Sequence, residues 1–465
     1  MPIDDLTIRL NYPYLMGVYL AVNATSDAFI LVDGPDCVTF KAEHIQGKHD
    51  WGSTLLDCRG LHRIVLSGAS RDTVSLARED EIERLLDGMA QREEGGVVIL
   101  CALTMCGMIS VDYQRVLRLV NERWNKIAFE IPTDTLVHDW LDGYGHMLNG
   151  FAANVPLRKQ RERRPDRVAI VGHLMHRTEG DCRGDVSELK RMLEGIGLEV
   201  ASVWLDGGTW DELSAAETAG TVISLPYGRM AAKTLARRLG ADLLEVGLPI
   251  GLEGTSRWLR EIASALGTTT LAERFIDREL SQTVPHLQWV IPEVFLNRRV
   301  ALVGDPHLLT GMLELTRELG LRPANVLALA REAHITDELK ALAPPSFHVQ
   351  VHEREWLNEM EATGEVDLVL TNNLGWQVIG NAFGPVMEMG FPSYFTHALS
   401  ERPTLGFRGV LQQAERMADA MLSDRMRRGR RPPTSAPRFE EPASRMSAVS
   451  SGDAVPGDVA ASPRR

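Results

Sequence analysis

The sequence contains few cysteines, and their number and spacing restrict what they can do. Five cysteines occur in 465 residues, and no two of them form a compact C-x-x-C pair. An odd number of cysteines argues against a disulfide framework. Residues 1–5 contain no basic segment and no apolar stretch follows them, so we do not expect secretion. These features together predict a reducing, cytoplasmic environment.

Other missing features narrow the class of protein further. No apolar run approaches the roughly 20 residues that a membrane span requires. The formal net charge is −13, and no basic stripe with interleaved aromatic residues occurs before the last 41 residues, so nucleic acid is not an expected partner. The loop at 172–176 does not have the G-x-G-x-x-G spacing of a dinucleotide site, and no P-loop is present. These absences exclude a P-loop nucleotide site and the dinucleotide fingerprint in this chain.

Short apolar runs that alternate with helical segments dominate the rest of the sequence. This pattern predicts an α/β protein with three Rossmann-like domains, each a parallel sheet flanked by helices. The expected boundaries are 1–155, 166–270 and 298–423, with a charged linker at 156–166 and a helical connection at 271–296. Residues 425–465 hold nine arginines against four acidic residues and almost no aromatic residues. We therefore expect a disordered tail over 424–465.

Three cysteines fall in loops that flank the predicted strands of the first domain. Cys37 follows the apolar run at 28–32, Cys58 precedes the strand at 63–66, and Cys106 follows the strand at 96–103. The carboxyl ends of parallel strands lie together, so Cys37 and Cys106 could be neighbours. Thiolates that meet there would suit an iron–sulfur cluster or zinc, although buried cysteines acting as small apolar residues remain an alternative. Cys101 lies within an apolar strand and is expected in the core.

The order of several motifs resembles the nitrogenase component 1 superfamily. The chain reads V-D-G-P-D-C at 32–37, I-V-L-S-G at 64–68 and T-M-C-G-M-I-S-V-D at 104–112. In that family the matching motifs of the first domain read roughly H/D-G-P-x-G-C, V-F-G-G and S/T-x-C-x-x-x-x-I-G-D-D. The likeness continues through P-I-G at 249–251, V-G-D at 303–305 and L-G-F-R-G at 405–409. The superfamily includes nitrogenase molybdenum–iron proteins and the dark-operative protochlorophyllide and chlorophyllide reductases.

The resemblance implies an oxidoreductase subunit that carries an iron–sulfur cluster, of the 4Fe–4S type or related to it. It assigns Cys37, Cys58 and Cys106 as ligands, with a fourth ligand available from a partner subunit. It also implies a homologous second subunit or a homodimer, a separate iron-protein-like reductase that hydrolyses ATP, and a small-molecule substrate between the domains. The segment 248–255 lacks the cysteine that holds the large cofactor of true nitrogenase, which argues against dinitrogen reduction by this subunit.

Several other side chains could carry chemistry. His173, His176, Asp181 and Cys182 follow the first strand of the second domain and could bind zinc, present a proton donor, or make ordinary polar loop contacts. Asp33 and Asp36 are expected to initiate a turn beside Gly-Pro.

His44, His49 and His62 are expected to be solvated. A non-catalytic scaffold for metallocofactor assembly and a cluster-free binding protein remain alternative functions.

Overall fold

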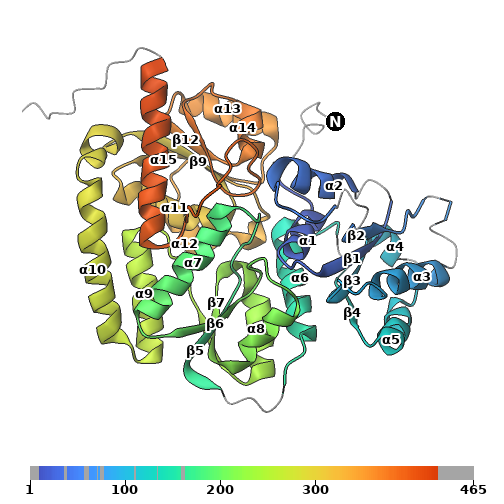
Figure 1. Cartoon of the computed structure of the whole chain (residues 1–465). Coiled ribbons are helices and arrows are strands. Elements are labelled where there is room, and N and C mark those ends of the chain that lie inside the picture. Colours follow the sequence, from blue (N-terminus) through green and yellow to red (C-terminus); the bar gives the residue numbers. More distant parts are fainter. Residues whose placement is uncertain are drawn as a thin grey trace, which may run out of the picture. The chain divides into compact units, whose positions relative to one another are not determined.

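Three parallel sheets organise the residues that the computed structural model describes, which are 10–35, 39–56, 62–70, 72–73, 78–108, 111–132, 135–158 and 163–427. Helices flank each sheet (Figure 1). The predicted fold class, three Rossmann-like α/β units, is confirmed. Within the described residues, none of the helices combines the length and apolar character needed to cross a membrane.

The first sheet has the strand order β2-β1-β3-β4. Its central strands, β1 and β3, pair in parallel from Ala28 opposite Val97 to Asp33 opposite Ala102, and every residue in them is buried. Strands buried on both faces are continuous apolar runs in sequence, which is why both were predicted. The elements are β1 (Ala28–Asp33), α2 (Thr39–His44), η3 (Ile45–His49), β2 (Ile64–Leu66), α3 (Glu79–Ala90), β3 (Val97–Ala102), α4 (Thr104–Gly107), α5 (Tyr113–Trp124) and β4 (Ile127–Glu130).

The second sheet has the strand order β6-β5-β7-β8, and its strands also run in parallel. Its elements are β5 (Arg164–Val171), α7 (Gly180–Gly195), β6 (Glu199–Val203), η4 (Asp211–Thr218), β7 (Ala219–Ser224), η5 (Pro226–Gly228), α8 (Arg229–Leu239), β8 (Asp242–Glu245), α9 (Leu252–Leu266) and α10 (Thr269–Leu287).

The third sheet has five parallel strands in the order β11-β10-β9-β12-β13. Helix α15 packs along α10 and contacts α7 and α9, so the end of this unit covers the second one (Figure 1). The elements are η6 (Ile291–Phe295), β9 (Arg299–Gly304), α11 (Pro306–Glu318), β10 (Arg322–Ala328), η7 (Glu332–His334), α12 (Asp337–Leu342), β11 (Phe347–Val349), α13 (Glu353–Thr363), β12 (Leu368–Thr371), α14 (Asn373–Ile379), β13 (Val386–Glu388) and α15 (Gly406–Arg427).

Two helices join the first sheet to the others. Every residue of α1 (Tyr14–Asn23) is buried, and α1 packs against α6 (Trp140–Asn154). The backbones approach so closely that a Cβ added at Gly17 would lie 1.7 Å from the carbonyl oxygen of Trp140, and one at Gly143 would lie 2.0 Å from that of Tyr14. Glycine at both positions is therefore required by the packing. The Trp140 indole also donates to the Leu329 carbonyl oxygen after β10, at 3.3 Å.

The structure corrects three details of the sequence-based expectations. Strand β5 begins at Arg164, so the end of the predicted linker at 156–166 is part of the second sheet. Cys182 lies in the first turn of α7 and not in the preceding loop. Helix α15 continues to Arg427, so the first residues of the tail predicted at 424–465 are helical. The segment from 428 onward lies outside the described residues.

Candidate functional site

The carboxyl ends of β1, β2 and β3 converge at one edge of the first sheet, where Asp33 is the last residue of β1. The Asp33 carboxylate is fully buried and accepts hydrogen bonds from Ser67 Oγ at 2.6 Å, Tyr113 Oη at 2.5 Å and Arg78 Nη1 at 2.7 Å. Asp33 is therefore an ion-paired core residue; the turn predicted beside it extends to Asp36, which lies outside the described residues. The backbone N–H of Gly34 donates to Ser67 Oγ at 3.0 Å.

Cys106 lies beside this buried ion pair, in the short helix α4. Its side chain is buried, and burial together with the nearby Asp33 carboxylate raises the pKa of the thiol to about 11, while the Arg78 guanidinium acts in the opposite direction. The Leu103 N–H donates to the Asp33 carbonyl oxygen at 2.9 Å, which ties the start of α4 to the end of β1. Burial raises the pKa of Cys101 to about 12, and its place within β3 agrees with core packing.

Of the three predicted cluster ligands, only Cys106 belongs to the described part of the chain. Cys37 and Cys58 lie outside the described residues, as does Asp36. A cysteine at this edge is a ligand type that an iron–sulfur cluster takes. The Arg78 guanidinium beside it favours the thiolate, but burial and the Asp33 carboxylate outweigh that effect on the thiol pKa. Sequence reasoning did not single out Arg78 or Tyr113, whereas Ser67 lies within the motif at 64–68 and the end of β1 at Asp33 was predictable.

Exposed apolar side chains follow two neighbouring strands, β3 and β4, at this end of the sheet. Met105 and Met108 follow β3, and Leu136 and Val137 follow β4; we call these four residues the apolar rim. The side chains of Met108 and Leu136 are both 82% exposed. The hydroxyls of Thr104 and Thr135 are 2.9 Å apart, which brings the two segments together. Exposed apolar patches of this kind mark interaction surfaces.

A second group of polar residues lies where the carboxyl edges of the second and third sheets face each other. They line a cavity of about 70 Å³. Its wall includes the Asp305 carboxylate, which accepts from Tyr227 Oη at 2.8 Å, and the Glu388 carboxylate, which accepts three backbone N–H groups from 394–396. Burial raises the pKa of Asp185, which accepts from the backbone of Thr404 and Leu405, to about 8. A larger hollow of about 370 Å³ shares Leu248 with this cavity.

The expectation that His49 is solvated was wrong. Its side chain is completely buried where the three α/β units meet. Its Nδ1 lies 2.8 Å from the backbone nitrogen of Ser393, and its Nε2 lies 3.0 Å from the carbonyl oxygen of His176. Burial and the nearby His176 ring hold the pKa of His49 well below its usual value. His44 is partly buried against Tyr394, so it too departs from the expected solvated state, whereas His62 is exposed as predicted. The local sequence could not indicate that His49 is buried and His44 partly buried, because this burial arises only where the three α/β units pack together.

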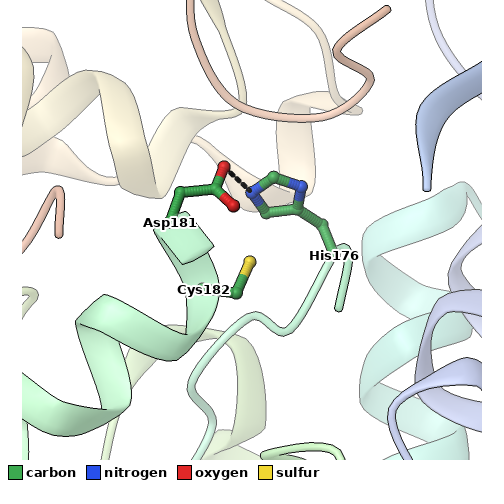
Figure 2. A group of neighbouring side chains, drawn as sticks. All are labelled: His176, Asp181 and Cys182. Carbon is green, nitrogen blue, oxygen red and sulfur yellow. Dashed lines mark ion pairs between the residues drawn. The ribbon is translucent and has the colours of Figure 1, made fainter. Parts of the chain in front are cut away.

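The constellation at 173–182 is brought together only in part. His176 Nε2 lies 3.9 Å from Asp181 Oδ2, and the Cys182 sulfur lies within 4.8 Å of one ligand atom of each (Figure 2). Arg177 donates to Asp181 through Nε at 2.9 and 3.0 Å and through Nη2 at 2.6 Å. His173 lines the cavity but is not part of this group.

Comparisons with known proteins agree on the family and the fold. A family model described as Nitrogenase component 1 type Oxidoreductase matches residues 14–422. The nitrogenase vanadium–iron protein β chain of Trichormus variabilis is 26% identical over 271 residues, an alignment that covers 52% of this chain and 58% of that relative. The nitrogenase molybdenum–iron protein β chain of Acidithiobacillus ferridurans is 22% identical over 371 residues, covering 71% of this chain and 70% of the relative.

A solved structure titled "Nitrogenase Cp1 at pH 6.5" superposes with a TM-score of 0.75 at 16% identity, and the match covers 91% of this chain and 94% of that one. At this identity the likeness concerns the fold alone. It extends over all three sheets.

Proposed function

This chain belongs to the nitrogenase component 1 type oxidoreductase family, and we propose from this that it is one subunit of a nitrogenase-like two-component reductase. The observation that supports the proposal is the place of Cys106, a buried thiol at the carboxyl edge of the first sheet with a guanidinium beside it. In the proposal Cys37, Cys58 and Cys106 hold an iron–sulfur cluster of the 4Fe–4S type or one related to it. A partner subunit could supply a fourth ligand.

Burial and the Asp33 carboxylate favour the neutral thiol of Cys106, and only the Arg78 guanidinium among the causes of its pKa shift acts strongly toward the thiolate, so bound iron itself would have to displace the thiol proton. Arg78 is fixed by its ion pair with Asp33, so its positive charge stays close to Cys106. Burial of Cys106 limits water around the sulfur, and both charge and solvent access tune the potential of a cluster. When bound, the cluster would supply one-electron transfer between a reductase and a substrate.

The proposed partners follow from the apolar rim around Cys106. We assign this surface to a homologous second subunit, or to a second copy of the chain, because methionine and aliphatic side chains would lose their contact with water there. A separate reductase that hydrolyses ATP would deliver the electrons, with the cytoplasm as the expected compartment. The β chains of vanadium–iron and molybdenum–iron nitrogenases among the relatives support a β-type role within such an assembly.

The size of the cavity between the second and third sheets bears on whether this subunit binds a substrate. Pockets for small molecules usually measure roughly 300–1,000 Å³, whereas the cavity between the second and third sheets has about 70 Å³. A tetrapyrrole would not fit there without movement of the walls. The adjoining hollow of about 370 Å³, which shares Leu248 with this cavity, lies within that range, so a small substrate bound by this chain would occupy the hollow. A non-catalytic scaffold for metallocofactor assembly is a second candidate, because a scaffold needs no substrate pocket.

Iron content tests the cluster assignment. The Cys106→Ser protein, purified without oxygen, should lose most of its bound iron and its brown colour, because a hydroxyl is a poor ligand for an iron–sulfur cluster. Cys101→Ser is the matched control, a buried cysteine within β3. Equal iron in both variants would contradict the assignment, and a colourless wild-type protein would favour the cluster-free alternative. Substrate turnover with an ATP-dependent reductase separates the reductase from the scaffold.

A further inference from the structure

A group of three side chains of metal-ligating types lies far in sequence from Cys37, Cys58 and Cys106. His176 comes from the segment after β5, and Asp181 and Cys182 come from the first turn of α7. Their side chains converge (Figure 2), and His176 and Asp181 also line the cavity between the second and third sheets. We propose that His176 Nε2, the Asp181 carboxylate and the Cys182 thiolate bind one transition-metal dication of the zinc type. This inference goes beyond the proposed function and does not depend on it.

The donor types match such an ion. Imidazole, carboxylate and thiolate are all zinc ligands, and two ligands of a tetrahedral zinc are separated by roughly 3.3–3.8 Å. For a nitrogen and an oxygen ligand the separation is about 3.3 Å, so the 3.9 Å between His176 Nε2 and Asp181 Oδ2 would have to shorten on binding. Small side-chain rotations would complete the geometry, since all three ligand atoms already lie within 4.8 Å of one another.

The charges around the site bear on which ion it can hold. Binding of a dication with loss of the Cys182 thiol proton would add one positive charge, because the Asp181 carboxylate is already ionised and paired with Arg177. A buried site holds such a charge only when further carboxylates lie near it. Arg177 would keep its contact with Asp181 and has Glu179 as a second carboxylate partner at 3.4 Å.

The residues around the three ligands form the outer support that metal sites usually have. A ligating histidine normally hydrogen-bonds through its other ring nitrogen, and ligating carboxylates are themselves hydrogen-bonded. His176 Nδ1 lies 3.3 Å from His49 Nε2, and Arg177 binds Asp181. The Ser393 N–H donates to His49 Nδ1 at 2.8 Å, so a neutral His49 carries its proton on Nε2 and donates toward His176. Metal binding by His176 Nε2 therefore requires His49 to adopt its other tautomer, with Nδ1–H directed to the Ser393 carbonyl oxygen 3.2 Å away.

The fourth position of the metal would face the cavity, which His176 and Asp181 both line. Two further side chains in its wall are deeply buried, His173 with 3% and Gln413 with 2% of their surface exposed. Neither His173 Nε2 nor Gln413 Oε1 has a hydrogen-bond partner among the described residues. A water on the open metal position would lie in the same cavity as these two atoms. Three protein ligands with an open position are the arrangement of a reactive zinc site and not of a structural one.

Zinc retention by the full-length protein tests the proposal. The protein is incubated with Zn²⁺ alone, passed through a desalting column and analysed for zinc and iron, and X-ray absorption at the zinc edge reports the ligand types. We expect one zinc per chain with a single sulfur ligand. Cys182→Ser and His176→Gln should each lower zinc retention at least about 10-fold, a loss that even outer partners of metal sites can cause. Their iron content should stay unchanged.

Cys101→Ser is the control for replacing a buried thiol and should retain zinc. A wild-type protein that retains no zinc would overturn the proposal, as would equal retention by Cys182→Ser. A wild-type spectrum with several sulfur ligands would also overturn it, because zinc would then occupy the cysteines of the first sheet. The wild-type spectrum decides the matter even where a variant fails to fold.

Discussion

The contact between His334 and the start of α6 should make stability depend on pH. His334 Nε2 lies 3.2 Å from Asp139 Oδ1 and 3.3 Å from Asp142 Oδ1. Asp139 is the N-cap of α6 and Asp142 completes its capping box, so this contact joins the third unit to the first. Arg331 also binds both carboxylates, and the His307 ring lies near His334. The two carboxylates outweigh the effect of burial and raise the pKa of His334 to about 9.

The sign of the effect follows from this shift. A folded-state pKa of about 9 lies above the usual value of 6.5, so the protonated ring stabilises the fold fully below pH 6.5, and that stability is lost as the pH rises through 9. With one pKa unit equal to about 1.4 kcal/mol, the contribution is on the order of 3 kcal/mol at pH 6, about 2 kcal/mol at pH 7.5 and a few tenths of a kcal/mol at pH 9.5.

His334→Gln removes the charge while keeping a polar side chain of similar size. Urea unfolding should show the variant clearly less stable than wild type at pH 6 and nearly equal to it at pH 9.5. Tryptophan fluorescence is a suitable signal, because the buried Trp140 directly follows Asp139. His286→Gln, which changes an exposed histidine of α10, should show no such trend. A stability difference for His334→Gln that is the same at both pH values would refute the reasoning.

Three further changes test the fold and the edge of the first sheet. Gly17→Ala should cost at least about 1–3 kcal/mol in thermal unfolding, because the new methyl group would overlap the Trp140 carbonyl oxygen; unchanged stability would mean that α1 and α6 can move apart freely. Asp33→Asn should cost about 3–5 kcal/mol, because the buried Arg78 loses its ionic partner, and full stability by chemical denaturation would argue against the pair. Removal of residues 428–465 should leave the thermal transition unchanged, and a lower midpoint would show that the tail supports the fold.

Much of the architecture was predictable from sequence because local patterns encode it. Continuous apolar runs such as 28–32 become strands buried on both faces, and glycines such as Gly320 (φ +79°) follow helix ends. The place of Cys106 after a buried strand was also visible, as were the family motifs around it. Element limits were less accurate, since the predicted linker at 156–166 runs into β5 and α15 extends to Arg427.

The chemistry around these elements depends on contacts between distant segments. The ion pair of Asp33 with Arg78 and the burial of His49 against Ser393 join residues that are 45 and 344 positions apart. No local pattern records such a contact, because it forms only when separate strands or whole units pack together. The sequence by itself therefore determined three parallel sheets and a thiol at the end of β3. Only the tertiary structure decided which charged groups lie beside that thiol and how small the cavity between the second and third sheets is. It also decided that the side chains of His176 and Cys182 lie close together.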